Sequence, residues 1–242
     1  MKKLYAKSEL WFSLLWIIVY VVLFSLADSI SVELGTEKMI TAPLCILMTV
    51  ILLLWIKQNN LLSKYGLAKI KVEHKKYLYY LPLLVLISTN LWGGIALHLS
   101  PVETVLYVVS MIGVGILEEV IFRGLLFKAL CMDNLKTAVV ISSVTFGIGH
   151  IVNLLNGADI LPTLLQIVYA TAAGFLFTIL FHRSGTLLPC IITHSAINSL
   201  SAFGAQRSQT LDLIAAAVLT VLSLLYAWWI LTKTSCKYAT RT

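Results

Sequence analysis

Long uninterrupted blocks of apolar residues recur along this chain and constrain its fold more than any other feature. A helix that crosses a bilayer needs about 20 predominantly apolar residues. The chain is 59% hydrophobic and 12% charged, whereas a soluble domain has roughly 45–50% and about 25%. We therefore predict an all-α fold, a polytopic transmembrane helical bundle of about eight spanning helices, as a single integral membrane domain over residues 1–242. The predicted spans are residues 9–27, 40–56, 77–99, 104–130, 136–155, 160–181, 186–203 and 211–232.

The Lys and Arg residues fall almost entirely on one side of the predicted bundle. If both termini lie on the same side, that side holds all but two of the 18 Lys and Arg residues, and the two on the other side are Lys38 and Arg207. Cytoplasmic loops are enriched in Lys and Arg, so both termini are predicted to be cytoplasmic. This topology accounts for the net charge of +7 with the lipid bilayer as partner and no nucleic acid. We expect a multi-pass protein of the cell membrane, and the small loops favour a bacterial plasma membrane.

The fourth apolar block carries charged residues near its centre, where each costs roughly 2.5–3.5 kcal/mol in a bilayer. Arg123 follows Glu119 by four residues, so the two can pair on one helix face. Glu118 points about 100° away from Glu119 around the helix, toward a different neighbour. We expect the Glu119–Arg123 pair to be structural and Glu118 to be available for chemistry. Gly113 and Gly115 are expected to let helices pack closely.

Two later blocks carry histidines near their centres. Phe146 and His150 share a helix face at four-residue spacing, as do His194 and Asn198. Counted from the block ends, Glu118, His150 and His194 lie within about 6 Å of one depth. Any one of these residues alone could serve only as an interhelical hydrogen-bond partner or, for Phe146, as packing. Their common depth on three helices instead predicts a polar site inside the membrane.

These motifs resemble those of the CPBP family, the type II CAAX-processing and bacteriocin-processing intramembrane glutamic endopeptidases (Abi family). The EEVIFR sequence of residues 118–123 resembles the family's EExxxR motif, FGIGH of residues 146–150 its FxxxH motif, and HSAIN of residues 194–198 its HxxxN motif. Order and spacing both match. The resembling region, the predicted catalytic core, spans residues 102–203.

The resemblance implies a helical membrane peptidase in which a glutamate activates water. By analogy Glu118 is the general base, and His150 assists it. His194 and Asn198 would hold the water or stabilise the oxyanion. The supporting residues of the site would be Glu119, Arg123 and Phe146.

The predicted function is therefore that of an intramembrane endopeptidase that hydrolyses peptide bonds of membrane-associated or small peptide-precursor substrates. Its partners would be a peptide or membrane-protein substrate, and no cofactor or metal is predicted. Three alternatives stay open. A zinc-dependent protease could use the same residues, because two histidines and a glutamate are a competent ligand set. A bacteriocin-immunity or scaffold protein could bind a peptide without cleaving it, and a transporter could use the buried groups as a proton relay.

Overall fold

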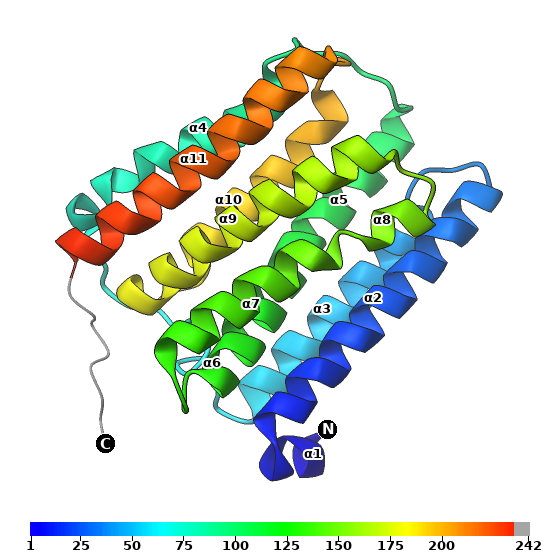
Figure 1. Ribbon diagram of the computed structural model, residues 1–242. Helices are drawn as coiled ribbons and strands as arrows, with labels where there is room; N and C mark the ends of the chain where they lie inside the picture. Colours follow the sequence, from blue (N-terminus) through cyan, green and yellow to red (C-terminus); the bar gives the residue numbers. More distant parts are fainter. Residues whose placement is uncertain (235–242) are drawn as a thin grey trace.

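The computed structural model describes residues 1–234 as a bundle of helices that run along a common direction (Figure 1). Apart from one bridge between Ile95 and Gly204, the described residues form no β structure, so the all-α prediction is confirmed. Six helical segments of the described chain are long and apolar enough to cross a membrane. They are α2 (Glu9–Glu33), α3 (Thr41–Gln58), α5 to α6 (Pro101–Leu130), α7 to α8 (Leu135–Leu155), α9 (Ile160–Ser184) and α11 (Gln209–Lys233).

Two of the predicted spans contain only shorter helices. Segment 77–99 holds α4 (Leu81–Ser88) between two 3₁₀ turns, η1 (His74–Tyr80) and η2 (Thr89–Leu91). Segment 186–203 holds α10 (Leu188–Leu200) and the turn η4 (Ser201–Phe203). The 13 residues of α10 extend about 20 Å at 1.5 Å per residue, which is less than the roughly 30 Å of hydrocarbon in a bilayer. The structure thus supports a multi-pass protein with six candidate spans, and the count of eight is not confirmed.

Small residues set the spacing between the helices that carry the motifs. A Cβ atom added to Gly115 of α5 would lie 2.7 Å from the backbone nitrogen of Ser195 in α10. A Cβ atom added to Gly147 of α7 would lie 2.9 Å from the carbonyl oxygen of Ile167 in α9. Backbones this close are possible only where no side chain intervenes. Gly115 therefore acts in packing, as the sequence predicted.

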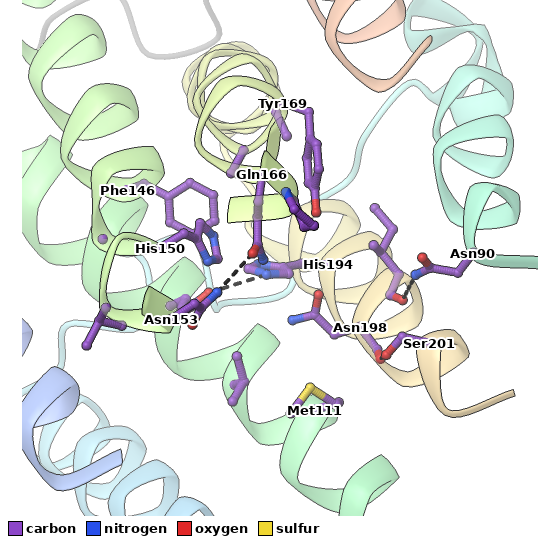
Figure 2. A pocket seen from close by; sticks show the side chains of 18 of the residues that line it. Asn90, Met111, Phe146, His150, Asn153, Gln166, Tyr169, His194, Asn198 and Ser201 are labelled. Carbon is purple, nitrogen blue, oxygen red and sulfur yellow. Dashed lines mark hydrogen bonds and ion pairs between the residues drawn. The ribbon is translucent and has the colours of Figure 1, made fainter. Parts of the chain in front are cut away.

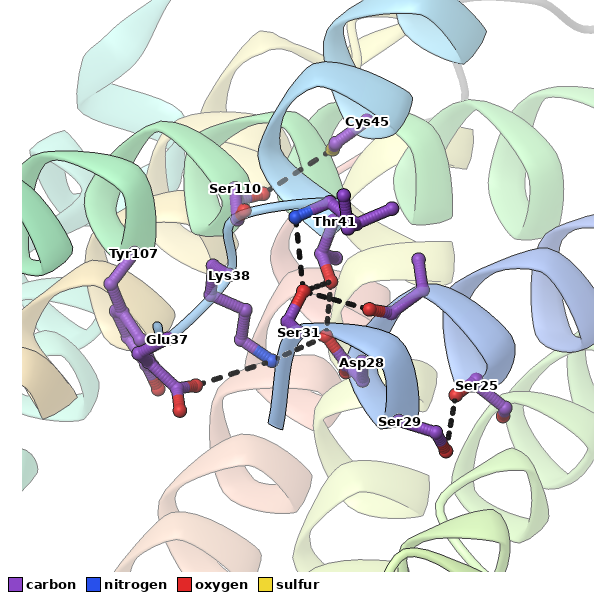
Figure 3. A network of polar contacts seen from close by, with 12 residues as sticks. Ser25, Asp28, Ser29, Ser31, Glu37, Lys38, Thr41, Cys45, Tyr107 and Ser110 are labelled. Carbon is purple, nitrogen blue, oxygen red and sulfur yellow. Dashed lines mark hydrogen bonds and ion pairs between the residues drawn. The ribbon is translucent and has the colours of Figure 1, made fainter. Parts of the chain in front are cut away.

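A polar network joins the ends of α2 and α3 around their connecting turn (Figure 3). The Lys38 ammonium donates to Asp28 Oδ1 at 2.9 Å, and the Thr41 hydroxyl donates to the same oxygen. The backbone N–H of Ile40 donates to Ser31 Oγ at 3.0 Å. These contacts fix the two helices as one hairpin, which forms a wall of the cavity described below.

At the other end of α2, Lys64 connects the loop that follows α3 to the first residues of α2. Its ammonium donates to the Glu9 carboxylate and, at 2.9 Å, to the Tyr5 hydroxyl. Burial alone lowers the pKa of Lys64, but the hydrogen bonds to Glu9 and Tyr5 outweigh it and raise that pKa. Through Tyr5, Lys64 also contacts the short helix α1 (Lys2–Lys7), which precedes α2.

Candidate active site

The two motif glutamates lie where α5 (Pro101–Glu118) changes into the π-helical segment η3 (Glu119–Leu126), which continues into α6 (Phe127–Leu130). Every residue of η3 is buried. Such π-helical turns are wider than α-helical ones and occur frequently at functional sites. Glu119 is 0% exposed, whereas Glu118 is 9% exposed and lines a cavity. The two neighbouring carboxylates therefore have different surroundings, as the sequence predicted.

The Glu118 carboxylate is held from two other helices. Its Oε1 accepts a hydrogen bond of 2.6 Å from the Tyr20 hydroxyl of α2. Its Oε2 lies 3.3 Å from His194 Nε2 of α10 and has no hydrogen-bond partner among the described residues. One oxygen is thus fixed by a donor, while the other is buried beside an imidazole nitrogen at the edge of the cavity that Glu118 lines.

The Glu119 carboxylate forms the ion pair that its spacing predicted. Arg123 Nη1 donates to Glu119 Oε1 at 3.1 Å, and both side chains are fully buried. The guanidinium carbon of Arg123 lies 4.1 Å from the ring centroid of Phe146 and 5.7 Å from that of Phe177. A guanidinium over aromatic faces is stabilised by cation–π attraction, more strongly where water is excluded. Glu119 and Arg123 therefore form a fully buried ion pair that packs against two aromatic rings of the cavity wall.

His194 connects the two glutamates, because each of its ring nitrogens faces one carboxylate. Nδ1 lies 2.9 Å from Glu119 Oε1, and Nε2 lies 3.3 Å from Glu118 Oε2. A neutral imidazole carries one N–H and one lone pair. If Nδ1–H donates to Glu119, Nε2 carries only a lone pair. A hydrogen bond between His194 Nε2 and Glu118 Oε2 then needs a further proton, on one atom or the other. One shared proton can thus bridge His194 Nε2 and Glu118 Oε2.

The remaining motif residues come from the ends of α7 (Leu135–Gly149) and α10. The Phe146 ring centroid lies 5.5 Å from that of His150 and 5.6 Å from that of His194, with near-perpendicular planes. His150 and Asn198 both line the cavity, and within residues 1–234 neither side chain has a hydrogen-bond partner. Their polar atoms are thus available to a bound peptide or water.

The cavity has a volume of about 560 Å³, and residues from nine α-helices of the described chain line it. Figure 2 shows His150, His194 and Asn198 gathered around it, with Asn153 and Gln166 beside them. Asn153 Nδ2 donates to Gln166 Oε1 at 2.9 Å, which links α8 (Val152–Leu155) to α9. The structure thus brings together all the predicted catalytic residues, Glu118, His150, His194 and Asn198, on one cavity.

Several polar residues of the cavity were missed by sequence reasoning, and Tyr20, Asn153 and Gln166 are three of them. Two of these three were visible as polar groups inside apolar blocks, since Tyr20 lies in α2 and Gln166 in α9. Nothing in their spacing assigned a partner. Within the described part of the chain, no three His, Cys, Asp or Glu side chains are grouped so that they could hold a metal ion.

The comparisons with known proteins agree with the motifs. Residues 99–200 match the family described as Type II CAAX prenyl endopeptidase Rce1-like. No curated protein and no solved structure matches the chain. The matched range contains the two glutamates, Arg123, both motif histidines and Asn198. The family match therefore covers the region that carries the motifs, and it agrees with the resemblance stated for them.

Proposed function

We propose that this chain is an intramembrane endopeptidase in which Glu118 activates a water molecule. The observation that carries the proposal is the setting of Glu118. Its carboxylate faces a cavity of about 560 Å³, with one oxygen fixed by Tyr20 and the other beside His194 Nε2. A general base must lie within hydrogen-bond reach of the proton that it removes, directly or through one water. A water bound in this cavity beside the Glu118 carboxylate satisfies that requirement.

The reaction begins when Glu118 accepts a proton from this water. The resulting hydroxide adds to the scissile carbonyl carbon, and the C=O electron pair moves to the oxygen. Donors that point at this oxyanion stabilise it, and His150 and Asn198 line the cavity with unoccupied polar atoms. The protonated Glu118 then gives its proton to the leaving nitrogen as the C–N bond breaks. One water is consumed, and the products are a carboxylic acid and an amine.

His194 is proposed to position Glu118 and to carry the shared proton. Glu119 accepts from Nδ1 and thereby fixes the ring orientation, so that Nε2 faces Glu118. Arg123 in turn neutralises Glu119 within the protein interior. This arrangement gives the two glutamates separate roles, chemistry for Glu118 and support for Glu119. The cavity volume suits a short extended peptide, so we propose a membrane-associated protein or a small peptide precursor as substrate.

The test is single-turnover cleavage of a library of membrane-anchored peptides by the purified protein in detergent. A general base typically contributes 10²–10⁴-fold to the rate, so Glu118→Gln is expected to lower the cleavage rate by at least about 100-fold. Glu103→Gln is the matched control. Glu103 is on the same helix α5 and completes a capping box with Ser100, a role that glutamine can also fill. Its side chain does not line the cavity.

Two other outcomes would replace this proposal. Cleavage that is abolished by a strong chelator and restored by zinc would make the histidines metal ligands, because metal-activated water would then be the nucleophile. Specific peptide binding without cleavage, unchanged in Glu118→Gln, would support a non-catalytic immunity or scaffold protein. Equal cleavage rates for the wild type and Glu118→Gln would also refute Glu118 as the base.

A further inference from the structure

The two ends of the helix bundle differ in charge. The basic end, where α1 begins and α11 ends (Figure 1), includes loops 59–73, 131–134 and 185–187. The acidic end includes loops 34–40, 92–100, 156–159 and 204–208. Among the described residues, the only Lys and Arg side chains at the acidic end are Lys38 and Arg207. Both are neutralised locally, since Lys38 Nζ lies 2.9 Å from Asp28 Oδ1 and Arg207 Nε lies 2.8 Å from Asp212 Oδ1.

From Phe122, one turn beyond Glu118 on the same helical segment, the cavity extends toward the acidic end. Its outermost lining residues belong to the loops and helix ends of that end, and include Asp28, Lys38, Asn156, Ser201 and Arg207. None of its lining residues belongs to the three loops of the basic end. The path by which a substrate reaches Glu118 therefore begins at the acidic end.

Packed side chains close the opposite direction. Between the site and the basic end lie Phe127, Leu180, Phe181 and Leu187, each at most 1% exposed. Phe127 and Phe181 pack edge to face with ring centroids 6.2 Å apart. Because protein interiors are packed without voids of water size, this layer leaves no route for a peptide from the basic end.

From these observations we infer that the active-site cavity opens on the non-cytoplasmic side of the membrane. Cytoplasmic loops are the ones enriched in Lys and Arg, which places the basic end in the cytoplasm. If the proposed function holds, the substrate is a peptide that presents its scissile bond from outside, such as an exported precursor or the outer segment of a membrane protein. A prenylated protein on the cytoplasmic surface could not reach Glu118 by this route.

The test introduces one reporter cysteine at a time and labels intact cells with a membrane-impermeant maleimide. Cys131 and Cys236 are replaced by serine, and the buried Cys45 and Cys190 are retained, with the protein lacking a reporter cysteine as the background control. Asn156→Cys reports on the cavity rim at the acidic end, where Asn156 is exposed. Met132→Cys reports on the basic end, where Met132 is 83% exposed. We expect Asn156→Cys to be labelled in intact cells, and Met132→Cys only after permeabilisation. The reverse pattern would overturn the inference.

A third position tests whether the cavity itself is open. Met111 lines the cavity seven residues before Glu118 on α5 (Figure 2), which is about 10 Å along the helix. The reagent is expected to reach Met111→Cys in intact cells, whereas labelling only after permeabilisation would refute access from outside. Labelling in detergent shows that each variant carries a reactive thiol. None of these readouts needs catalysis. Labelling from outside without any cleavage would reject the proposed peptidase but support a cavity that opens outward. Cleavage with labelling only after permeabilisation would support the peptidase and reject the outward opening.

Discussion

The close approach of α5 to α10 gives a quantitative test of how the site is held. In Gly115→Ala, the new Cβ atom would lie 2.7 Å from the backbone nitrogen of Ser195 and 2.9 Å from its Cα. Ordinary van der Waals contact begins near 3.4 Å, so α10 must move by about 0.7 Å, the difference between 3.4 and 2.7 Å. The new Cβ atom would also meet the Ser195 hydroxyl, which a rotamer change can move, but no rotamer change removes the two backbone atoms. The helices must therefore separate.

This separation should affect both stability and catalysis. Overpacking of this kind costs about 1–3 kcal/mol, against a gain of up to about 1 kcal/mol for alanine over glycine in a helix. His194 is on the displaced helix, so its 3.3 Å contact with Glu118 should lengthen to about 4 Å. Misplacement of about 1 Å at a catalytic group can lower the rate by around 100-fold. We expect a lower unfolding temperature in detergent and a cleavage rate reduced by 10-fold or more.

Gly149→Ala is the matched control, because a Cβ atom added to Gly149 meets nothing within 4 Å. Its unfolding temperature should equal or exceed that of the wild type, since alanine is the better helix former. Adding Ser195→Ala to Gly115→Ala should restore little, because the hydroxyl is removed and the backbone atoms stay. Wild-type stability of Gly115→Ala alone would refute the close packing of α5 and α10.

Two further substitutions test the contacts of the motif glutamates. Tyr20→Phe removes a hydrogen bond to a carboxylate, worth about 1.5–3 kcal/mol, and should slow cleavage by about 10–100-fold. The control Tyr226→Phe loses an equally short hydrogen bond of 2.6 Å outside the cavity and should cleave at the wild-type rate. Equal rates for both variants would exclude a role for Tyr20 at Glu118. Arg123→Met removes the ion-pair partner of the buried Glu119 carboxylate, which then keeps only its contact with His194, and should cost about 3–5 kcal/mol in unfolding free energy. Adding Glu119→Gln should recover part of that loss, and a double variant no more stable than the single one would show that Arg123 acts through something other than this charge.

The parts of the site that could be predicted from the sequence depend on local geometry. A four-residue spacing on one helix places Glu119 beside Arg123 whatever the other helices do. The common depth of Glu118 and His194 follows from helical rise and the membrane thickness. The observed distances of 3.1 Å and 3.3 Å agree with both arguments.

Other features depend on which helices are neighbours and on backbone irregularities. The bond from Tyr20 to Glu118 joins residues 98 positions apart, and no pattern in α2 shows which of its faces meets α5. The prediction of one continuous helix over residues 77–99 was wrong, because apolar composition does not show where the backbone leaves the α-helical conformation. Leu78 and Tyr79 have positive φ values of 48° and 50°, which the sequence gives no reason to expect of such residues. The wider turns of η3 are likewise a property of packing.

The division between matched and unmatched parts of the chain bears on what the enzyme selects. The groups proposed for chemistry all lie within residues 99–200, the region that matches the family. Much of the cavity wall comes from outside that region, including Phe24, Asp28, Asn90 and Arg207. A peptide that enters from the acidic end meets these residues before it reaches Glu118. The family match therefore covers the groups proposed for the reaction. We expect the choice of peptide to depend on the unmatched wall residues that do not contact Glu118, such as Phe24, Asn90 and Arg207.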